Sequence, residues 1–335
     1  MEKEALSLKH LSVDFKSESG LVHAVRDVNL SVKYGKTLGI VGESGCGKSV
    51  TVKSILRLHD EKITQYQGKI EFVNRQGNEK QLLDLTSHEL NQIRGNQISM
   101  IFQDPMTSLN PVIRVGEQVS EVIRKHQHLS RKAAKGKTLE LFATVGIRSP
   151  EKRYNQYPYE FSGGMQQRIL IAVALACNPS ILLADEPTTA LDVTIQSQIL
   201  KNMKEIQGYS GMAIVFITHD LGVVAHMCDD IAVMYAGQVV EYADTKSLFS
   251  NPLHPYTKGL LGTIPRLGGD RKPLETIEGM PPKLTQEIIG CPFAPRCRQC
   301  TEECRKNAVE LREVKSGRMV RCLHIEGGSE DTYGK

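Results

Sequence analysis

The sequence predicts an α/β fold with a parallel-stranded core, an antiparallel β subdomain, a helical subdomain and a small cysteine-rich appendage at the C-terminus. A glycine-rich turn at residues 42–49 lies between a short apolar run and a helical segment. Continuous apolar runs at residues 180–184 and 212–218 are typical of buried parallel strands. Beyond Asn251 the chain becomes rich in proline and cysteine, which indicates a boundary between a large core and a loop-rich region.

Length and charge limit the domain organisation and the partners. At 335 residues the chain exceeds one average domain. We expect a core domain over residues 1–250, with a helical subdomain at about 105–178, and a C-terminal domain over residues 251–335 that carries a cysteine cluster. The net charge of +4 is small for this length and the basic residues form no long run, so no nucleic-acid partner is expected.

The N-terminus and the apolar runs predict a cytosolic location. Residues 1–4 are charged and no apolar stretch follows them, so we expect no secretory signal. The longest apolar run, residues 169–177, is about half as long as a transmembrane helix needs to be, so membrane contact should be peripheral. A reducing cytosol also argues against structural disulfides among the eight cysteines.

Two strands are expected before the glycine-rich turn. Residues 7–13 and 25–32 alternate apolar and polar side chains with many β-branched members, which predicts antiparallel strands joined by the polar residues 16–20. Phe15 ends the first strand. Its ring either stacks on adenine or fills the edge of the core, and the second role is the commoner one for such an aromatic.

The glycine-rich turn predicts a site for nucleotide phosphates. Its members are Gly42, Glu43, Ser44, Gly45, Cys46, Gly47, Lys48 and Ser49. The glycines let the backbone curl until successive N–H groups point inward, and Lys48 and Ser49 can then reach β/γ-phosphate oxygens and Mg²⁺. The helix that follows would direct its positive N-terminal end at the phosphates.

Polar residues end three of the expected strands. The strand at residues 98–102 stops at Gln103, which is either a turn amide or a ligand group at the carboxyl edge of the sheet. Asp185 and Glu186 end the strand at 180–184, where Asp185 is suited to hold Mg²⁺ through water and Glu186 to act as general base. His219 closes the strand at 212–218. A lone histidine is usually structural, but its place beside the other two strand ends favours a γ-phosphate sensor.

A helical section and a second anion site are expected between these strands. Residues 115–145 carry helical periodicity with many basic side chains. Further on, Ser162, Gly163 and Gly164 open a long apolar helix and leave several backbone donors free. In isolation these three residues fit an ordinary serine cap equally well. Residues 231–241 predict a hairpin with Gly237 in its turn.

Five cysteines crowd into the C-terminal region. Cys291, Cys297, Cys300, Cys304 and Cys322 have the spacing C-x5-C-x2-C-x3-C-x17-C. This spacing matches neither the common zinc-finger patterns nor the ferredoxin runs of iron–sulfur proteins. A small, proline-rich region nevertheless needs a covalent or metal staple. An iron–sulfur cluster, zinc and unligated thiols all stay open on spacing alone.

Taken together, these motifs resemble the ATP-binding cassette family of transport ATPases over nearly the whole chain. Residues 42–49 correspond to Walker A, Gln103 to the Q-loop, residues 161–165 to the signature, residues 181–185 with Glu186 to Walker B, and His219 to the switch histidine. The resemblance implies ATP as the nucleotide and catalytic roles for Gln103, Glu186 and His219. It also implies Mg²⁺ beside Ser49, Gln103 and Asp185, and adenine stacking by Phe15.

Within that family, the chain is similar to the oligopeptide/dipeptide/nickel importer branch. Residues 100–111, 251–257 and 291–297 carry this likeness. In the branch, a set of four cysteines at the positions of Cys291, Cys297, Cys304 and Cys322 is associated with a [4Fe-4S] cluster, and Cys300 is surplus to it. Zinc stays the alternative. We expect Cys297 and Cys304 on one face of a short helix, because they are seven residues apart.

The resemblance implies an ATP-binding subunit that drives uptake of oligopeptides or dipeptides from the cytoplasmic face of the cell membrane. The expected partners are two transmembrane permease subunits, a second ATPase subunit in a head-to-tail dimer, and an extracellular solute-binding protein. Nickel-chelate or glutathione-like cargo is the nearest alternative. A non-transport cassette ATPase acting on DNA or ribosomes, and a redox or metal sensor built on the cysteines, are rivals from other classes.

Overall fold

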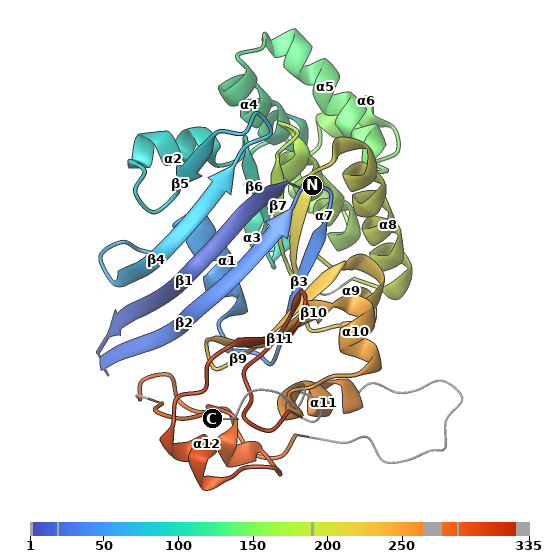
Figure 1. Cartoon of the computed structure of the whole chain (residues 1–335). Coiled ribbons are helices and arrows are strands. Elements are labelled where there is room, and N and C mark those ends of the chain that lie inside the picture. The colour runs from blue at the N-terminus through green and yellow to red at the C-terminus, as the bar shows by residue number, and fades with distance from the viewer. Residues whose placement is uncertain (1–2, 19, 189–190, 264–276, 287, 326–335) are drawn as a thin grey trace.

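A computed structural model describes residues 3–18, 20–188, 191–263, 277–286 and 288–325. Its strands form two sheets (Figure 1). The smaller sheet has the order β2-β1-β4-β5 and is antiparallel, and the larger has the order β11-β12-β10-β9-β3-β8-β7-β6. In the larger sheet, β9, β3, β8, β7 and β6 run parallel to their neighbours in that series, so their carboxyl ends share one edge.

The strands of the antiparallel sheet are β1 (Glu4–Ser17), β2 (Gly20–Lys33), β4 (Thr64–Val73) and β5 (Glu79–Gln81). Those of the larger sheet are β3 (Thr37–Val41), β6 (Ile98–Ile101), β7 (Ile181–Asp185), β8 (Ala213–Ile217), β9 (Asp230–Tyr235), β10 (Gln238–Asp244), β11 (Arg312–Lys315) and β12 (Arg318–Val320). The predicted N-terminal strand pair, the apolar parallel strands and the hairpin around Gly237 are all confirmed.

The helices are α1 (Lys48–Ile55), α2 (Ser87–Ile93), α3 (Pro105–Ser108), α4 (Val115–Gln127), α5 (Arg131–Thr144), α6 (Pro150–Tyr154), α7 (Gly163–Leu175), α8 (Val193–Ser210), α9 (Leu221–Met227), α10 (Thr245–Ser250), α11 (Pro255–Gly262) and α12 (Glu302–Lys306). The helical periodicity predicted over residues 115–145 belongs to two helices. His128 takes a left-handed backbone that ends α4, and the Ser130 hydroxyl accepts the Ala133 N–H at the start of α5.

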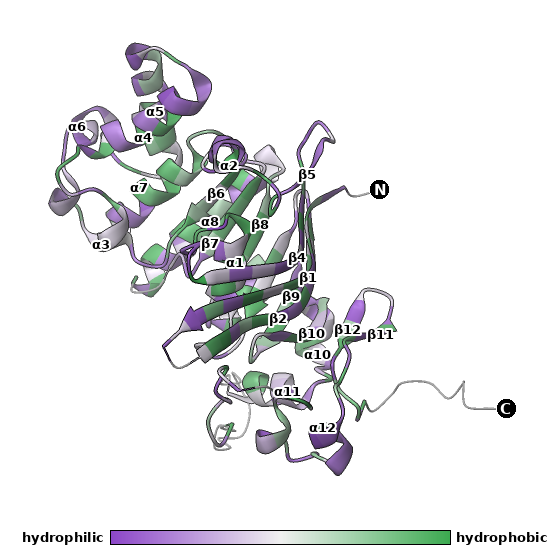
Figure 2. Ribbon diagram, turned by 90° about the vertical axis from the view of Figure 1, so that its left-hand side faces the viewer, coloured by the Kyte–Doolittle hydropathy of each residue, from purple (hydrophilic) through white to green (hydrophobic). Residues whose placement is uncertain are grey.

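Apolar side chains fill both faces of the larger sheet. One core lies between this sheet and the antiparallel sheet and includes Val52 and Ile55 of α1. The other core packs α7, α8 and α9 on the opposite face. Figure 2 shows hydrophobic colouring along strands of the larger sheet. Every residue of β7 and β8 is buried, because helices or strands cover them on both sides.

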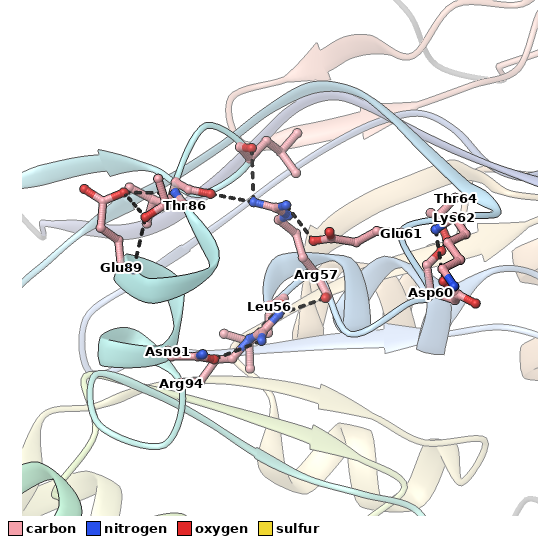
Figure 3. A network of polar contacts seen from close by, with 12 residues as sticks. Leu56, Arg57, Asp60, Glu61, Lys62, Thr64, Thr86, Glu89, Asn91 and Arg94 are labelled. Carbon is pink, nitrogen blue, oxygen red and sulfur yellow. Dashed lines mark hydrogen bonds and ion pairs between the residues drawn. The ribbon is translucent and has the colours of Figure 1, made fainter.

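A polar network fixes the end of α1 (Figure 3). The Arg94 guanidinium donates to the carbonyl oxygens of Leu56 at 2.6 Å and Arg57 at 2.9 Å, which supplies partners for carbonyls at the helix end. Arg57 in turn donates to the Leu85 carbonyl at 2.6 Å and pairs with Glu61 at 2.7 Å. The helix that starts at the glycine-rich turn is therefore anchored at its far end.

The C-terminal region is continuous with the larger sheet. Strand β12 pairs antiparallel with β10, with Val320 opposite Glu241. In the part of the chain that the structure describes, no single helix holds Cys297 and Cys304 on one face, contrary to the prediction. Helix α12 begins at Glu302, and Cys297 instead ends a separate turn over Ala294–Arg296. The prediction failed because the chain turns at residues 298–299 between the two cysteines, which seven-residue spacing cannot detect.

Candidate active site

The glycine-rich turn lies between β3 and α1, and two of its glycines are required by close backbone contacts. Gly42 has φ of 150°, and a Cβ there would lie 2.2 Å from the Met234 carbonyl oxygen. Gly47 has φ of 100°, and a Cβ there would lie 2.5 Å from the Ala24 carbonyl oxygen. Only glycine fits these positions without moving the backbone. The turn is therefore held closely against β2 and β9.

Lys48 and Ser49 begin α1 and already form contacts within the site. The Lys48 ammonium donates to the carbonyl oxygens of Gly42 at 2.8 Å and Glu43 at 2.9 Å, so its side chain curls back over the turn. The Ser49 hydroxyl donates to Asp185 Oδ1 at 2.9 Å. Cys46 is buried, which raises the pKa of its thiol, and its sulfur lies 3.7 Å from the Lys48 ammonium.

The ends of β6, β7 and β8 bring the predicted polar residues together. The Gln103 amide donates to Glu186 Oε2 at 3.0 Å. On the other side, His219 Nδ1 lies 3.4 Å from Glu186 Oε1. The Glu186 side chain is 15% exposed and that of His219 is 67% exposed, so the carboxylate is far more shielded from solvent than the imidazole. Parallel strand order explains the meeting of these three side chains.

Glu186 and Asp185 differ in backbone conformation and in burial. Glu186 has φ of 48°, an uncommon conformation for this residue type, and its N–H donates to the Ile217 carbonyl of β8 at 2.9 Å. Asp185 is almost fully buried, and this burial raises the pKa of its carboxyl, although the Ser49 hydroxyl opposes the rise. A divalent cation beside Asp185 would favour its ionised form.

Comparisons with known proteins agree with this geometry. Residues 25–189 match the family model described as ABC transporter, and residues 240–304 match the model described as the C-terminal region of oligopeptide/dipeptide transporters. The chain is 52% identical over 300 residues to the dipeptide transport ATP-binding protein DppD of Bacillus subtilis, covering 89% of this chain and 87% of the relative. The chain belongs to the ABC transporter family.

Further ABC proteins extend the likeness in sequence and in structure. The oligopeptide transport ATP-binding protein OppD of Escherichia coli is 47% identical over 318 residues, which cover 95% of this chain and 92% of OppD. A dimeric structure of the ATP-binding cassette MJ0796 in a post-hydrolysis state with ADP and Pi has a TM-score of 0.64 and 29% identity. It aligns with 72% of this chain and 98% of its own length. As a member of this family, the chain is an ATPase.

The signature residues of this ABC chain lie apart from its own glycine-rich turn. Ser162 is the N-terminal cap of α7 and is exposed, and its hydroxyl forms no capping hydrogen bond. A Cβ on Gly163 would meet no atom within 4 Å. Between described residues, no hydrogen bond or ion pair joins residues 162–164 to residues 42–49. One chain alone therefore leaves Ser162 and Gly163 exposed to solvent, while Gly164 packs against Ile195.

Phe15 lies in β1, and its ring packs edge-on against His59 at 5.1 Å between centroids. His59 follows α1 and is half-buried, and this burial lowers the pKa of its imidazole. The contact with His59 was not foreseen, because a ring pair 44 positions apart leaves no periodic signal in the sequence. Adenine stacking by Phe15 stays a prediction.

Four of the five clustered cysteines line one small cavity in the C-terminal region. They are the four that the importer branch predicts, Cys291, Cys297, Cys304 and Cys322, and Cys300 does not line it. His324, which the sequence did not single out, also lines it, with its Nε2 3.4 Å from the Cys304 sulfur. Burial raises the pKa of the Cys291 thiol to about 11.

The described residues contain no group of three or more histidine, cysteine or acidic side chains already close enough to hold a metal ion. All of the cysteines are free thiols. The donor set that lines the cavity is nevertheless sulfur-rich, which is the chemistry that iron–sulfur clusters and zinc require. No helix in the described part of the chain has the length and apolar character needed to cross a bilayer.

Proposed function

We propose that this chain is the ATP-binding subunit of a peptide importer, which hydrolyses ATP to drive uptake of oligopeptides or dipeptides through partner membrane subunits. The observation that carries the proposal is the joining of two features in one chain. Gln103, Glu186 and His219 meet beside a glycine-rich turn, and residues 240–304 match the oligopeptide/dipeptide transporter region. The relatives named for dipeptide and oligopeptide transport support this cargo over nickel chelates or glutathione-like molecules.

In this proposal the turn at residues 42–49 binds the phosphates of ATP. Its N–H groups and the N-terminal end of α1 face the anion, and Lys48 moves its ammonium from loop carbonyls to β/γ-phosphate oxygens. Ser49, Gln103 and Asp185 would hold Mg²⁺. When bound there, the ion would neutralise negative charge on the phosphates. The residues fit this ion because Ser49 and Asp185 are already in contact through oxygen atoms.

Glu186 takes the role of general base. Its carboxylate accepts a proton from the attacking water, while the Gln103 amide and the His219 imidazole hold that carboxylate at its two oxygens. The His219 side chain is more exposed than that of Glu186, so it is placed to contact the γ-phosphate. Phe15 completes the site by stacking on adenine.

The exposed signature residues favour a head-to-tail dimer. Ser162, Gly163 and Gly164 present an open helix N-terminus that would contact ATP bound on the turn of a second ATPase subunit. We infer that ATP binding closes this dimer and that hydrolysis reopens it. The helical subdomain at about 105–178 would pass the motion to two permease subunits at the cytoplasmic face of the membrane. An extracellular solute-binding protein would deliver the peptide.

The domain boundary and the cysteine cavity belong to the same proposal. Residues 1–250 form the ATPase domain and residues 251–335 the importer-type C-terminal domain, of which residues 264–276, 287 and 326–335 lie outside the described part. Cys291, Cys297, Cys304 and Cys322 would hold a structural [4Fe-4S] cluster, because these four line one cavity. Zinc is the alternative occupant of the same thiols.

Reconstitution tests the function directly. The chain, its partner ATPase and the permease subunits are placed in vesicles with the solute-binding protein, and uptake of a labelled dipeptide or pentapeptide is measured with ATP on the cytoplasmic side. Peptide uptake that stops when Glu186 is replaced by Gln supports the proposal. Uptake of a nickel chelate or glutathione with no peptide uptake would reassign the cargo, and ATP hydrolysis without any transport would favour a non-transport cassette.

A further inference from the structure

Arg296 of the C-terminal region forms a bidentate salt bridge with Glu43 of the glycine-rich turn. Its two terminal nitrogens lie 2.7 Å and 3.0 Å from the two carboxylate oxygens, although 253 positions separate the residues in sequence. The Arg296 side chain is 5% exposed and that of Glu43 is 27% exposed. A two-pronged guanidinium–carboxylate pair of low exposure belongs to the strong class of charge-assisted hydrogen bonds.

Residues other than Glu43 also fix the guanidinium, most of them in the C-terminal region. Arg296 donates to the carbonyl oxygens of Glu278 at 2.9 Å and Ile277 at 3.1 Å. It lies over the rings of Tyr235 and Phe293, 5.8 Å and 6.0 Å from their centroids. A cation fixed by carbonyls and aromatic faces is preorganised, so little side-chain entropy is lost in pairing with the carboxylate.

Tyr256 provides a second link between the C-terminal region and the same residue. Its hydroxyl accepts the backbone N–H of Glu43 at 2.9 Å. The Tyr256 side chain is fully buried and its ring packs against Tyr235 at 4.6 Å. The backbone and the carboxylate of Glu43 are thus both held from outside the turn.

When the turn binds a phosphate, Glu43 needs partners outside the turn, for two reasons. The Lys48 ammonium now holds the carbonyl oxygens of Gly42 and Glu43, and a phosphate that recruits this ammonium removes those bonds. A carboxylate in a phosphate-binding turn also repels the incoming anion unless a cation neutralises it. Arg296 has both effects: its bonds hold Glu43 in place when the Lys48 ammonium leaves, and its positive charge neutralises the Glu43 carboxylate.

We propose that Arg296 is a positioning residue for ATP binding, through which the C-terminal region sets the nucleotide affinity of the turn at residues 42–49. Arg296 acts through Glu43 and does not itself touch the nucleotide. Arg296 directly precedes Cys297, which lines the cysteine cavity. The residue that holds Glu43 is therefore bonded directly to a residue of that cavity. The inference rests on the proposed role of residues 42–49 as the phosphate-binding turn.

A double-mutant cycle on the full chain tests the inference. The Kd of a fluorescent ATP analogue with Mg²⁺ is measured for Arg296→Ala, Glu43→Gln and the pair, and turnover is measured in the assembled transporter. Arg296→Ala should raise Kd about tenfold, within the usual range of coupling between sites, while kcat at saturating ATP stays within about twofold. The pair should bind no worse than Arg296→Ala alone, because Glu43→Gln removes the unpaired carboxylate.

Two further variants separate this effect from misfolding. Arg296→Lys keeps the charge but cannot form the two-pronged contact, so about a threefold to fivefold rise in Kd is expected with an unchanged melting temperature. Arg298→Ala, at an exposed arginine two positions on, is the matched control and should leave Kd unchanged. Kd values within twofold of wild type for both Arg296 variants, or effects that multiply in the double variant, would overturn the inference.

The same titration distinguishes this failure from failure of the proposed phosphate-binding turn. Lys48→Ala should abolish binding of the analogue. If Lys48→Ala binds normally, the role assigned to residues 42–49 is wrong and the Arg296 inference falls with it. If Lys48→Ala does not bind while the Arg296 variants bind like wild type, only the Arg296 inference is overturned.

Discussion

Replacing Glu186 with Gln tests the proposed chemistry with the smallest change in structure. Glutamine keeps the shape of the side chain, and its oxygen can still accept the Gln103 amide, which now donates at 3.0 Å. The unusual backbone at Glu186 is held by its N–H bond to Ile217, which involves no side chain. The fold should therefore be preserved, and the loss is confined to the proton acceptor.

The expected effect follows from the role of a general base. A positioned base contributes at least ~10²-fold to a rate, so turnover should fall by that factor, equivalent to about 2.7 kcal/mol in the barrier. ATP affinity should not fall, because Lys48 and Ser49 contact other atoms of the site. The ATP-bound, closed dimer should accumulate as a result.

Two measurements check this prediction. Phosphate release by the assembled transporter at saturating ATP gives turnover, and equilibrium binding of labelled ATP gives occupancy. Glu205→Gln, at an exposed acid of α8, is the matched control and should behave like wild type. Turnover of Glu186→Gln within a few-fold of wild type would remove Glu186 from the role of base.

Three further predictions concern the dimer, the cavity and the turn. Ser162→Arg in one subunit should abolish hydrolysis of ATP bound on the other subunit's turn, and loss confined to the mutated subunit's own turn would contradict the head-to-tail arrangement. Anaerobically purified wild-type protein should contain iron and sulfide; Cys304→Ser should lose both while Cys300→Ser keeps them, whereas stoichiometric zinc without iron would reject the cluster. Gly47→Ala should abolish ATP binding, because the added Cβ would clash with the Ala24 carbonyl oxygen of β2 and distort the turn. Its control is Gly136→Ala on α5, where a Cβ meets no atom; this change should raise the free energy of unfolding by about 0.5–1 kcal/mol, measured by thermal unfolding. Normal ATP binding by Gly47→Ala would show that the turn tolerates a Cβ there.

The sheet edge where Gln103, Glu186 and His219 meet could be predicted, because apolar strands and the polar residues that end them are visible in the local sequence. Apolar runs mark β7 and β8 as buried parallel strands, and such strands end at a common edge. The meeting of Gln103, Glu186 and His219 follows from that geometry once the strands pair.

The contacts of the C-terminal region could not be predicted in this way. The salt bridge between Arg296 and Glu43 joins residues far apart in sequence, and so does the pairing of β12 with β10. Such polar pairs have no periodicity, and many alternative partners of the same charge exist along the chain. The prediction of a helix between Cys297 and Cys304 failed for a related reason, since spacing alone cannot show a turn between two cysteines.

The buried carboxylate of Glu241 shows why the C-terminal region and the larger sheet depend on each other. Glu241 lies in β10, is fully buried, and accepts the backbone N–H groups of Leu253 at 2.9 Å and His254 at 2.8 Å. Its third partner is Arg318 of β12 at 3.2 Å. All of these donors lie beyond Asn251. Without them a buried charge on β10 would lack compensation, at a cost of about 3–5 kcal/mol. Because that is a large share of the stability of an ordinary domain, the ATPase core and the C-terminal region should unfold together.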